Sequence, residues 1–163
     1  YPWMEYFFKE KADQYRRTHL EEGLRVIPYM ACVDEFQHEV YAQKMADAKE
    51  RYKLWHSLEE KYMPWRDYDG DAFLEAGGFW MQKQHIFMCP FYYIDYSLAS
   101  MGAFEYYIRS LNDREEAWKD YYRLCTMGGS KGYLELLDEG NLSNPFSEGT
   151  VEGIMKKLRK KIF

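Results

Sequence analysis

The sequence has little of what marks several common classes of protein. Its 163 residues include three cysteines, Cys32, Cys89 and Cys125, and no Cys-x-x-Cys spacing. An odd number of separated cysteines argues against a disulfide framework and against a structural zinc site. We therefore expect a reduced, cytoplasmic protein.

Long apolar runs and an excess of basic residues are also missing. No segment is long and apolar enough to cross a membrane, and Arg16 and Arg17 interrupt any apolar run that could form a signal peptide. The formal net charge is −5, whereas a nucleic-acid-binding surface needs a basic face. We expect neither a membrane nor a nucleic acid as partner. The chain begins at Tyr1 rather than Met, which leads us to expect an internal fragment of a longer protein.

The alternating pattern of β-strands is absent, and helical spacing takes its place. Apolar residues recur every three or four positions, which is the spacing of amphipathic helices. Pro28 lies inside the first long segment and predicts a kink or break there. We expect an all-α protein, a single helical domain over residues 1–163. The predicted helices are 10–42, 45–62, 90–111, 115–127, 133–138 and a last one from about Thr150.

The segment 80–100, WMQKQHIFMCPFYYIDYSLAS, is unusual because polar-tipped aromatic residues follow a histidine. Each buried phenol needs a hydrogen-bond partner, and an ordinary core would use Leu, Ile and Val instead. His85 lies beside a predicted break, and Tyr92, Tyr93 and Tyr96 are expected on the first turns of the helix after Pro90. From the residues alone, two interpretations remain open: a polar functional site, or an aromatic core in which every buried hydroxyl has a hydrogen-bond partner.

A second candidate for a functional site is the pair Glu35 and His38, which have the Glu-x-x-His spacing. Di-iron helical proteins use this spacing, but they need a second copy and two further glutamates. A buried His38 paired with a nearby acid is the interpretation that we favour. The sequence also contains no HExxH, no serine in a nucleophile elbow and no phosphate-binding loop.

Several segments carry a family resemblance in the same order along the chain. They are PWMEYFF, ADQYRRTHLEEGLRVIPYMACVDEFQHEVYA, YMPWRDYDG, GGFWMQKQHIFMCPFYYIDY and the Gly-Gly-Ser stretch at 128–130. Together they resemble the C-terminal part of the oligoendopeptidase F family of zinc metallopeptidases, which is related to thimet oligopeptidase.

The resemblance implies a large, mostly helical peptidase with a deep channel. It implies a zinc ion held by the two histidines of HExxH and a later Glu, with the glutamate of HExxH activating the bound water. It places catalytic roles on His85 and Tyr96, where Tyr96 matches the oxyanion tyrosine. It gives substrate binding to Tyr92, with Tyr93 as a close neighbour that shares the role.

The departure from the family is that HExxH and the third zinc ligand are both missing from these residues. We therefore expect no metal ligand in this chain, zinc only in the intact enzyme, and an inactive fragment when the chain is alone. The implied function is hydrolysis of peptide bonds in short oligopeptides, with the missing N-terminal part as partner. The alternative is a non-catalytic helical module that binds a peptide or protein, and an upstream region without HExxH would favour it.

Overall fold

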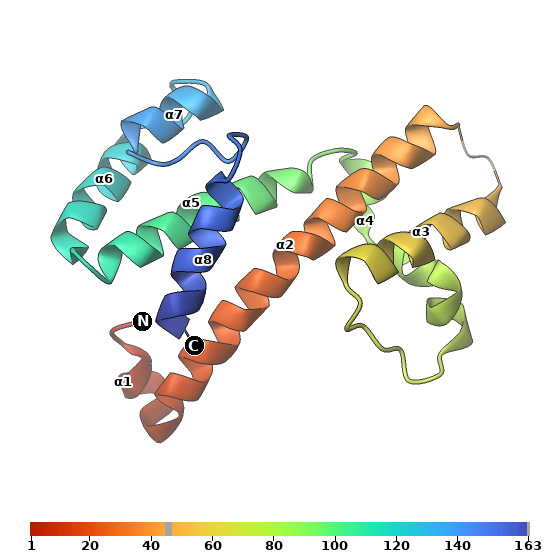
Figure 1. The fold of residues 1–163 in the computed structure, drawn as a ribbon, viewed down its shortest axis with the longest axis horizontal. Coiled ribbons are helices and arrows are strands. Elements are labelled where there is room, and N and C mark those ends of the chain that lie inside the picture. The colour runs from red at the N-terminus through yellow and green to blue at the C-terminus, as the bar shows by residue number, and fades with distance from the viewer. Residues whose placement is uncertain (45–46, 163) are drawn as a thin grey trace. The chain divides into compact units, whose positions relative to one another are not determined.

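The computed structural model describes residues 1–44 and 47–162 of the chain. Every regular element in these ranges is a helix, which confirms the all-α prediction. The chain divides into two compact units, residues 1–97 and 98–163. The elements (Figure 1) are α1 Met4–Phe8, η1 Lys9–Lys11, α2 Ala12–Ala42, α3 Ala48–Tyr62, η2 Leu74–Gly78, η3 Phe79–Gln82, α4 Gln84–Met88, α5 Ile94–Ser110, α6 Arg114–Met127, α7 Tyr133–Glu139 and α8 Thr150–Ile162.

Helix α2 is the backbone of the first unit and runs for 31 residues. It continues through Pro28, so of the kink or break predicted at that residue, the break does not occur. A proline inside a helix costs roughly 3 kcal/mol. The turns directly after it bury Val33 and Phe36 almost completely, and each such side chain contributes about 1.5–3 kcal/mol when removed from water. Burial of this face therefore offsets the cost of the proline.

Helix α3 begins with a side-chain cap. The Asp47 carboxylate accepts a hydrogen bond from the Lys49 N–H at 2.8 Å, which satisfies one of the donors that a helix start leaves open. The helix ends at Tyr62, shortly before Pro64. The sequence predicts a start at Met45, which lies outside the described residues.

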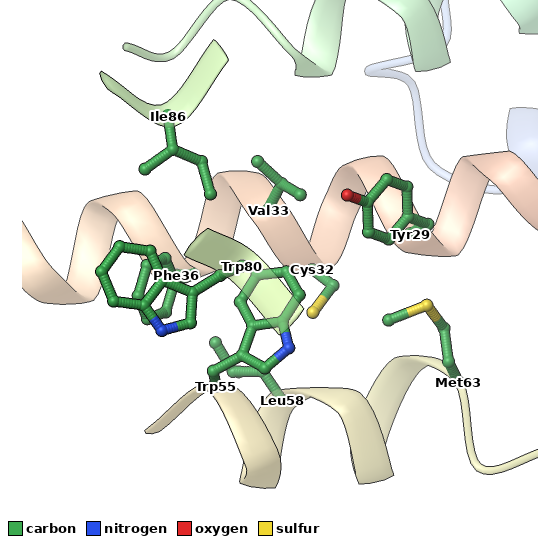
Figure 2. Packing of buried hydrophobic residues seen from close by; sticks show 9 residues of the cluster. All are labelled: Tyr29, Cys32, Val33, Phe36, Trp55, Leu58, Met63, Trp80 and Ile86. Carbon is green, nitrogen blue, oxygen red and sulfur yellow. The ribbon is translucent and has the colours of Figure 1, made fainter. Parts of the chain in front are cut away.

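The core of the first unit lies where α2 faces α3 (Figure 2). Trp55 and Leu58 of α3 point toward α2, and Ile86 of α4 reaches α2 from the other side. The ring of Phe36 meets that of Trp55 edge to face at 5.2 Å. The buried cluster comprises Tyr29, Cys32, Val33, Phe36, Trp55, Leu58, Met63, Trp80 and Ile86.

The turn at Gly77 brings the segment after α3 back against that helix. Gly77 has φ 93°, and a Cβ placed there would lie 2.1 Å from the Tyr52 carbonyl oxygen. Only glycine tolerates both this dihedral and this approach. The turn leads directly into η3 and α4, so it sets the path of the chain toward His85.

In the second unit, Asp113 caps α6 by accepting from the Glu116 N–H at 3.1 Å. Asp120 of α6 forms an ion pair with Arg109 of α5 and accepts from the Asn141 amide at 3.0 Å. These bonds join α5, α6 and the turn after α7. Within the described part of the chain, no helix combines the length and the apolar character needed to span a membrane.

Candidate functional site

The candidate site is formed by a short stretch that turns from α4 into α5. His85 lies in the first turn of α4, and its carbonyl accepts from the Cys89 N–H at 3.0 Å where that helix ends. The Tyr92 N–H then donates to the Cys89 carbonyl at 3.2 Å. Helix α5 begins at Ile94, so Tyr92 and Tyr93 lie in the connecting loop. The prediction that they occupy the first turns of a helix from Pro90 is wrong, because a turn follows the short helix α4 and delays the start of α5 to Ile94.

This turn brings the three tyrosines around the His85 ring. The Tyr93 ring centroid lies 4.9 Å from that of His85. The Tyr92 ring lies at 6.3 Å and nearly parallel to the imidazole, at 11°. The Tyr96 ring lies at 6.2 Å and nearly perpendicular, at 84°. All four residues proposed from the sequence as site residues therefore form one aromatic cluster.

Tyr92 and Tyr96 present the exposed side of this cluster. Their side chains are 45% and 40% exposed, and their rings meet nearly at right angles with centroids 5.3 Å apart. A hydrogen bond with Tyr96 is the main cause that raises the pKa of Tyr92. A raised phenol pKa means that this bond favours the protonated form of Tyr92, so the two hydroxyls share a proton-bearing contact at the exposed side of the cluster.

Tyr93 has a different environment from its neighbours. Its ring is half-buried and packs edge to face on Tyr29 of α2 at 5.8 Å. Burial raises the pKa of Tyr93 and raises that of Tyr29 further. Tyr93 therefore forms the inner wall of the cluster, and Tyr29 supports it from behind. The sequence gives no sign that Tyr29 supports the site, because Tyr29 is one of several apolar positions along α2.

Glu35 and His38 do not form a common site. Glu35 pairs with Lys61 of α3 and accepts a hydrogen bond from Tyr62. His38 is an exposed residue, with 65% of its side chain accessible, and its Nε2 lies 3.4 Å from the Asp34 carboxylate one turn earlier. The expectation of an acidic partner for His38 is met, but the expectation of a buried His38 is wrong.

Asp34 lies near the cluster and has a raised pKa. Burial is the main cause, the nearby His38 opposes it, and Asp95 of α5 adds to it. Asp34 and Asp95 both belong to the first unit, close to the loop that carries the tyrosines. Nowhere in the described ranges do three or more His, Cys, Asp or Glu side chains converge in a way that could bind a metal ion.

Comparison with solved structures identifies what this arrangement is related to. A protein described as an oligoendopeptidase F, solved by X-ray crystallography at 3.1 Å, shares 45% of its sequence with this chain and superposes with a TM-score of 0.95. The alignment covers 99% of this chain and 28% of that protein. The chain is related to one part of oligoendopeptidase F. The resemblance stated from its motifs is thereby confirmed.

Two further structures agree with this assignment. PZ peptidase A, solved with an inhibitor, is 46% identical with a TM-score of 0.94, and the alignment covers 99% of this chain and 29% of the peptidase. A protein from Bacillus anthracis described as an oligoendopeptidase F is 39% identical with a TM-score of 0.79. The alignment with it covers 99% of this chain and 25% of that protein. No protein-family model matches the sequence, and a search of curated proteins gives no match.

The chain thus spans between a quarter and a third of the length of these oligoendopeptidase F relatives. At 39–46% identity over nearly all of its residues, its helical fold is that of the corresponding part of theirs. The relatives are described as peptidases, which supports a peptidase origin for this chain.

Proposed function

We propose that this chain supplies the substrate-binding and oxyanion-stabilising groups of a zinc metalloendopeptidase that hydrolyses short oligopeptides. The supporting observation is the meeting of His85 with Tyr92, Tyr93 and Tyr96 in a relative of oligoendopeptidase F. A cytoplasmic location belongs to the same proposal. It is supported by Cys32, Cys89 and Cys125, which are all free thiols.

Tyr96 is assigned the central catalytic role. Attack of water on a peptide carbonyl places negative charge on the carbonyl oxygen, and a positioned hydroxyl stabilises that charge by donating to it. The Tyr92 and Tyr96 hydroxyls are joined by a hydrogen bond. A hydroxyl that accepts one hydrogen bond becomes polarised and donates more strongly through its own proton. We assign Tyr92 as the donor within this pair, so that it strengthens Tyr96 as a donor to the oxyanion.

His85 is assigned the orientation of the peptide beside Tyr96. One of its ring nitrogens carries a proton that can donate to a peptide carbonyl, and the other can accept from a peptide N–H. Its contact with all three tyrosine rings fixes the plane of the imidazole. Tyr92 and Tyr93 complete the substrate-binding surface, Tyr92 at its exposed edge and Tyr93 as its inner wall.

The zinc ion implied by the family does not fit the residues of this chain. The sequence contains no HExxH, and the part that the structure describes holds no cluster of metal-binding side chains. We therefore assign the zinc ligands to residues outside this chain and derive no catalytic step through the metal. For the same reason, the proposed partner of the chain is the remaining part of the enzyme, and the 163 residues alone are expected to be inactive.

Substitution of Tyr96 by Phe in the complete gene product tests the proposal. Loss of one donor to an oxyanion lowers kcat by roughly 100- to 1,000-fold, and KM changes far less because the bond forms mainly in the transition state. Tyr122, an exposed tyrosine of α6, provides the matched control, and Tyr122→Phe is expected to retain wild-type kinetics. A wild-type kcat for Tyr96→Phe would remove Tyr96 from this role and favour the non-catalytic binding module.

A further inference from the structure

We propose that Gln37 is a positioning residue that holds the tyrosine-bearing loop in its active conformation. The inference rests on the proposed function and extends it to a residue that lies outside the aromatic cluster. Gln37 belongs to α2, and its side chain is 1% exposed. Its Oε1 accepts a hydrogen bond from the Phe91 N–H at 3.2 Å, across 54 positions of the sequence.

The acceptor of this bond lies on the apolar face of a helix. Gln37 lies four residues after Val33 and three before Val40, so it shares their face of α2. A glutamine at such a position costs free energy unless its amide is bonded. The Phe91 N–H engages the oxygen, which leaves the Nε2 group with no hydrogen-bond partner among the described residues. The backbone of the loop is therefore the partner that accounts for a glutamine at this depth.

The donor of the bond lies at a strained point of the chain. Phe91 has φ 63°, the left-handed region, which costs an L-residue with a side chain roughly 1–2 kcal/mol. Two contacts with α2 offset this cost: the Phe91 ring packs on His38 at 4.8 Å and on Tyr41 at 5.2 Å. The hydrogen bond to Gln37 fixes the Pro90–Phe91 peptide unit, directly before the strained dihedral angles of Phe91.

The consequence for the site follows from chain geometry. The dihedral angles of Phe91 set the direction of the chain at Tyr92 and Tyr93. Tyr96 follows three residues after Tyr93, and its N–H donates to the Tyr93 carbonyl at 3.3 Å. If the bond to Gln37 is lost, Phe91 can relax toward ordinary backbone angles, and the tyrosines then move relative to His85. A displacement of about 1 Å can cost on the order of 100-fold in rate.

Two substitutions of Gln37 distinguish the effect of its hydrogen-bond acceptor from the effect of its side-chain shape. Gln37→Met keeps the length and burial but removes the acceptor, and it also removes the Nε2 group that lacks a partner. Gln37→Glu keeps an oxygen that can accept from Phe91, and at a side chain that is 1% exposed the carboxyl is expected to be protonated, so that it stays neutral like the amide. Leu58→Ala, a core change on α3, serves as the control for general loosening of the core.

The first readout is amide exchange of the segment that contains Phe91, measured by hydrogen-exchange mass spectrometry on the complete gene product. We expect exchange to be about tenfold faster in Gln37→Met because the local opening becomes easier, and to be near wild type in Gln37→Glu. The second readout is kinetics of the complete gene product. We expect kcat to fall about tenfold or more in Gln37→Met with a small change in KM, and to recover in Gln37→Glu.

These readouts distinguish the inference from the proposed function. Unchanged exchange at Phe91 in Gln37→Met would overturn the anchor. Faster exchange with a wild-type kcat, while Tyr96→Phe is impaired, would overturn the positioning role and leave the proposed function intact. If Leu58→Ala loses as much kcat as Gln37→Met, the positioning role of Gln37 is also overturned. If Tyr96→Phe keeps its kcat, the proposed function fails, and the exchange data still decide whether Gln37 holds the loop.

Discussion

The imidazole of His85 lies nearly parallel to the phenol ring of Tyr92, at 11° with centroids 6.3 Å apart. A substitution can therefore keep the ring and remove only its nitrogens. We predict that His85→Phe retains the aromatic packing and loses one hydrogen bond to the substrate, which is worth about tenfold in kcat/KM. The loss should fall mainly on KM. Steady-state kinetics of the complete gene product provide the measurement, and a wild-type KM would contradict substrate binding by His85.

The thiols should differ sharply in reactivity. Cys32 is completely buried, and burial raises the pKa of its thiol to about 12, whereas Cys89 and Cys125 are exposed. The thiolate is the reactive form. We predict that iodoacetamide near neutral pH modifies Cys89 and Cys125 in the folded chain and modifies Cys32 only after denaturation. Intact-mass analysis gives the count, and rapid labelling of Cys32 in the native chain would disagree with the packing of α2 against α3.

Two glycine substitutions should act in opposite directions. Gly77→Ala places a Cβ against the Tyr52 carbonyl at φ 93°, and we expect a loss of more than about 1 kcal/mol of unfolding free energy. Gly153→Ala lies inside α8 with no atom within 4 Å of the added Cβ, and we expect a gain of about 0.5–1 kcal/mol. Urea denaturation monitored by circular dichroism measures both. Equal stability of the two variants would refute the close approach at Gly77.

The Asp120 ion pair should make stability depend on pH. The Arg109 guanidinium, followed by the Asn141 amide, holds the pKa of the Asp120 carboxyl below its usual range. A lowered pKa in the folded state means that the stabilisation is present above the unfolded pKa of about 4 and disappears as the pH falls through the folded value.

We therefore predict that Asp120→Asn destabilises the chain by roughly 2 kcal/mol at neutral pH, the worth of a hydrogen bond to a charged partner. The difference from wild type should shrink as the pH is lowered below about 4. Chemical denaturation at several pH values tests this, with Asp113→Asn as a control that retains a capping residue. A difference that stays constant with pH would exclude the ion pair as its source.

The sequence predicted those features that depend on residues close together in the chain. The helix expected at 115–127 and the grouping of His85 with Tyr92, Tyr93 and Tyr96 are of this kind. The features that it did not predict depend on distant residues. Burial against α3 and α4 carries α2 through Pro28, and the turn at Phe91 relies on Gln37, 54 positions away. No periodicity or spacing reveals such a partner, although a glutamine between Val33 and Val40 is a visible irregularity.

The bond from Phe91 to Gln37 also has a consequence for the order of folding. His85 and Tyr96 are eleven positions apart, and closing a loop of that size takes on the order of 10–100 ns. The contact with Gln37 closes a much longer segment, which includes the whole of α3, and such non-local contacts form slowly. The aromatic rings can therefore meet early in folding, whereas the loop acquires its final conformation only when α2 packs against it. A nascent chain would have its tyrosines assembled before it had them correctly oriented.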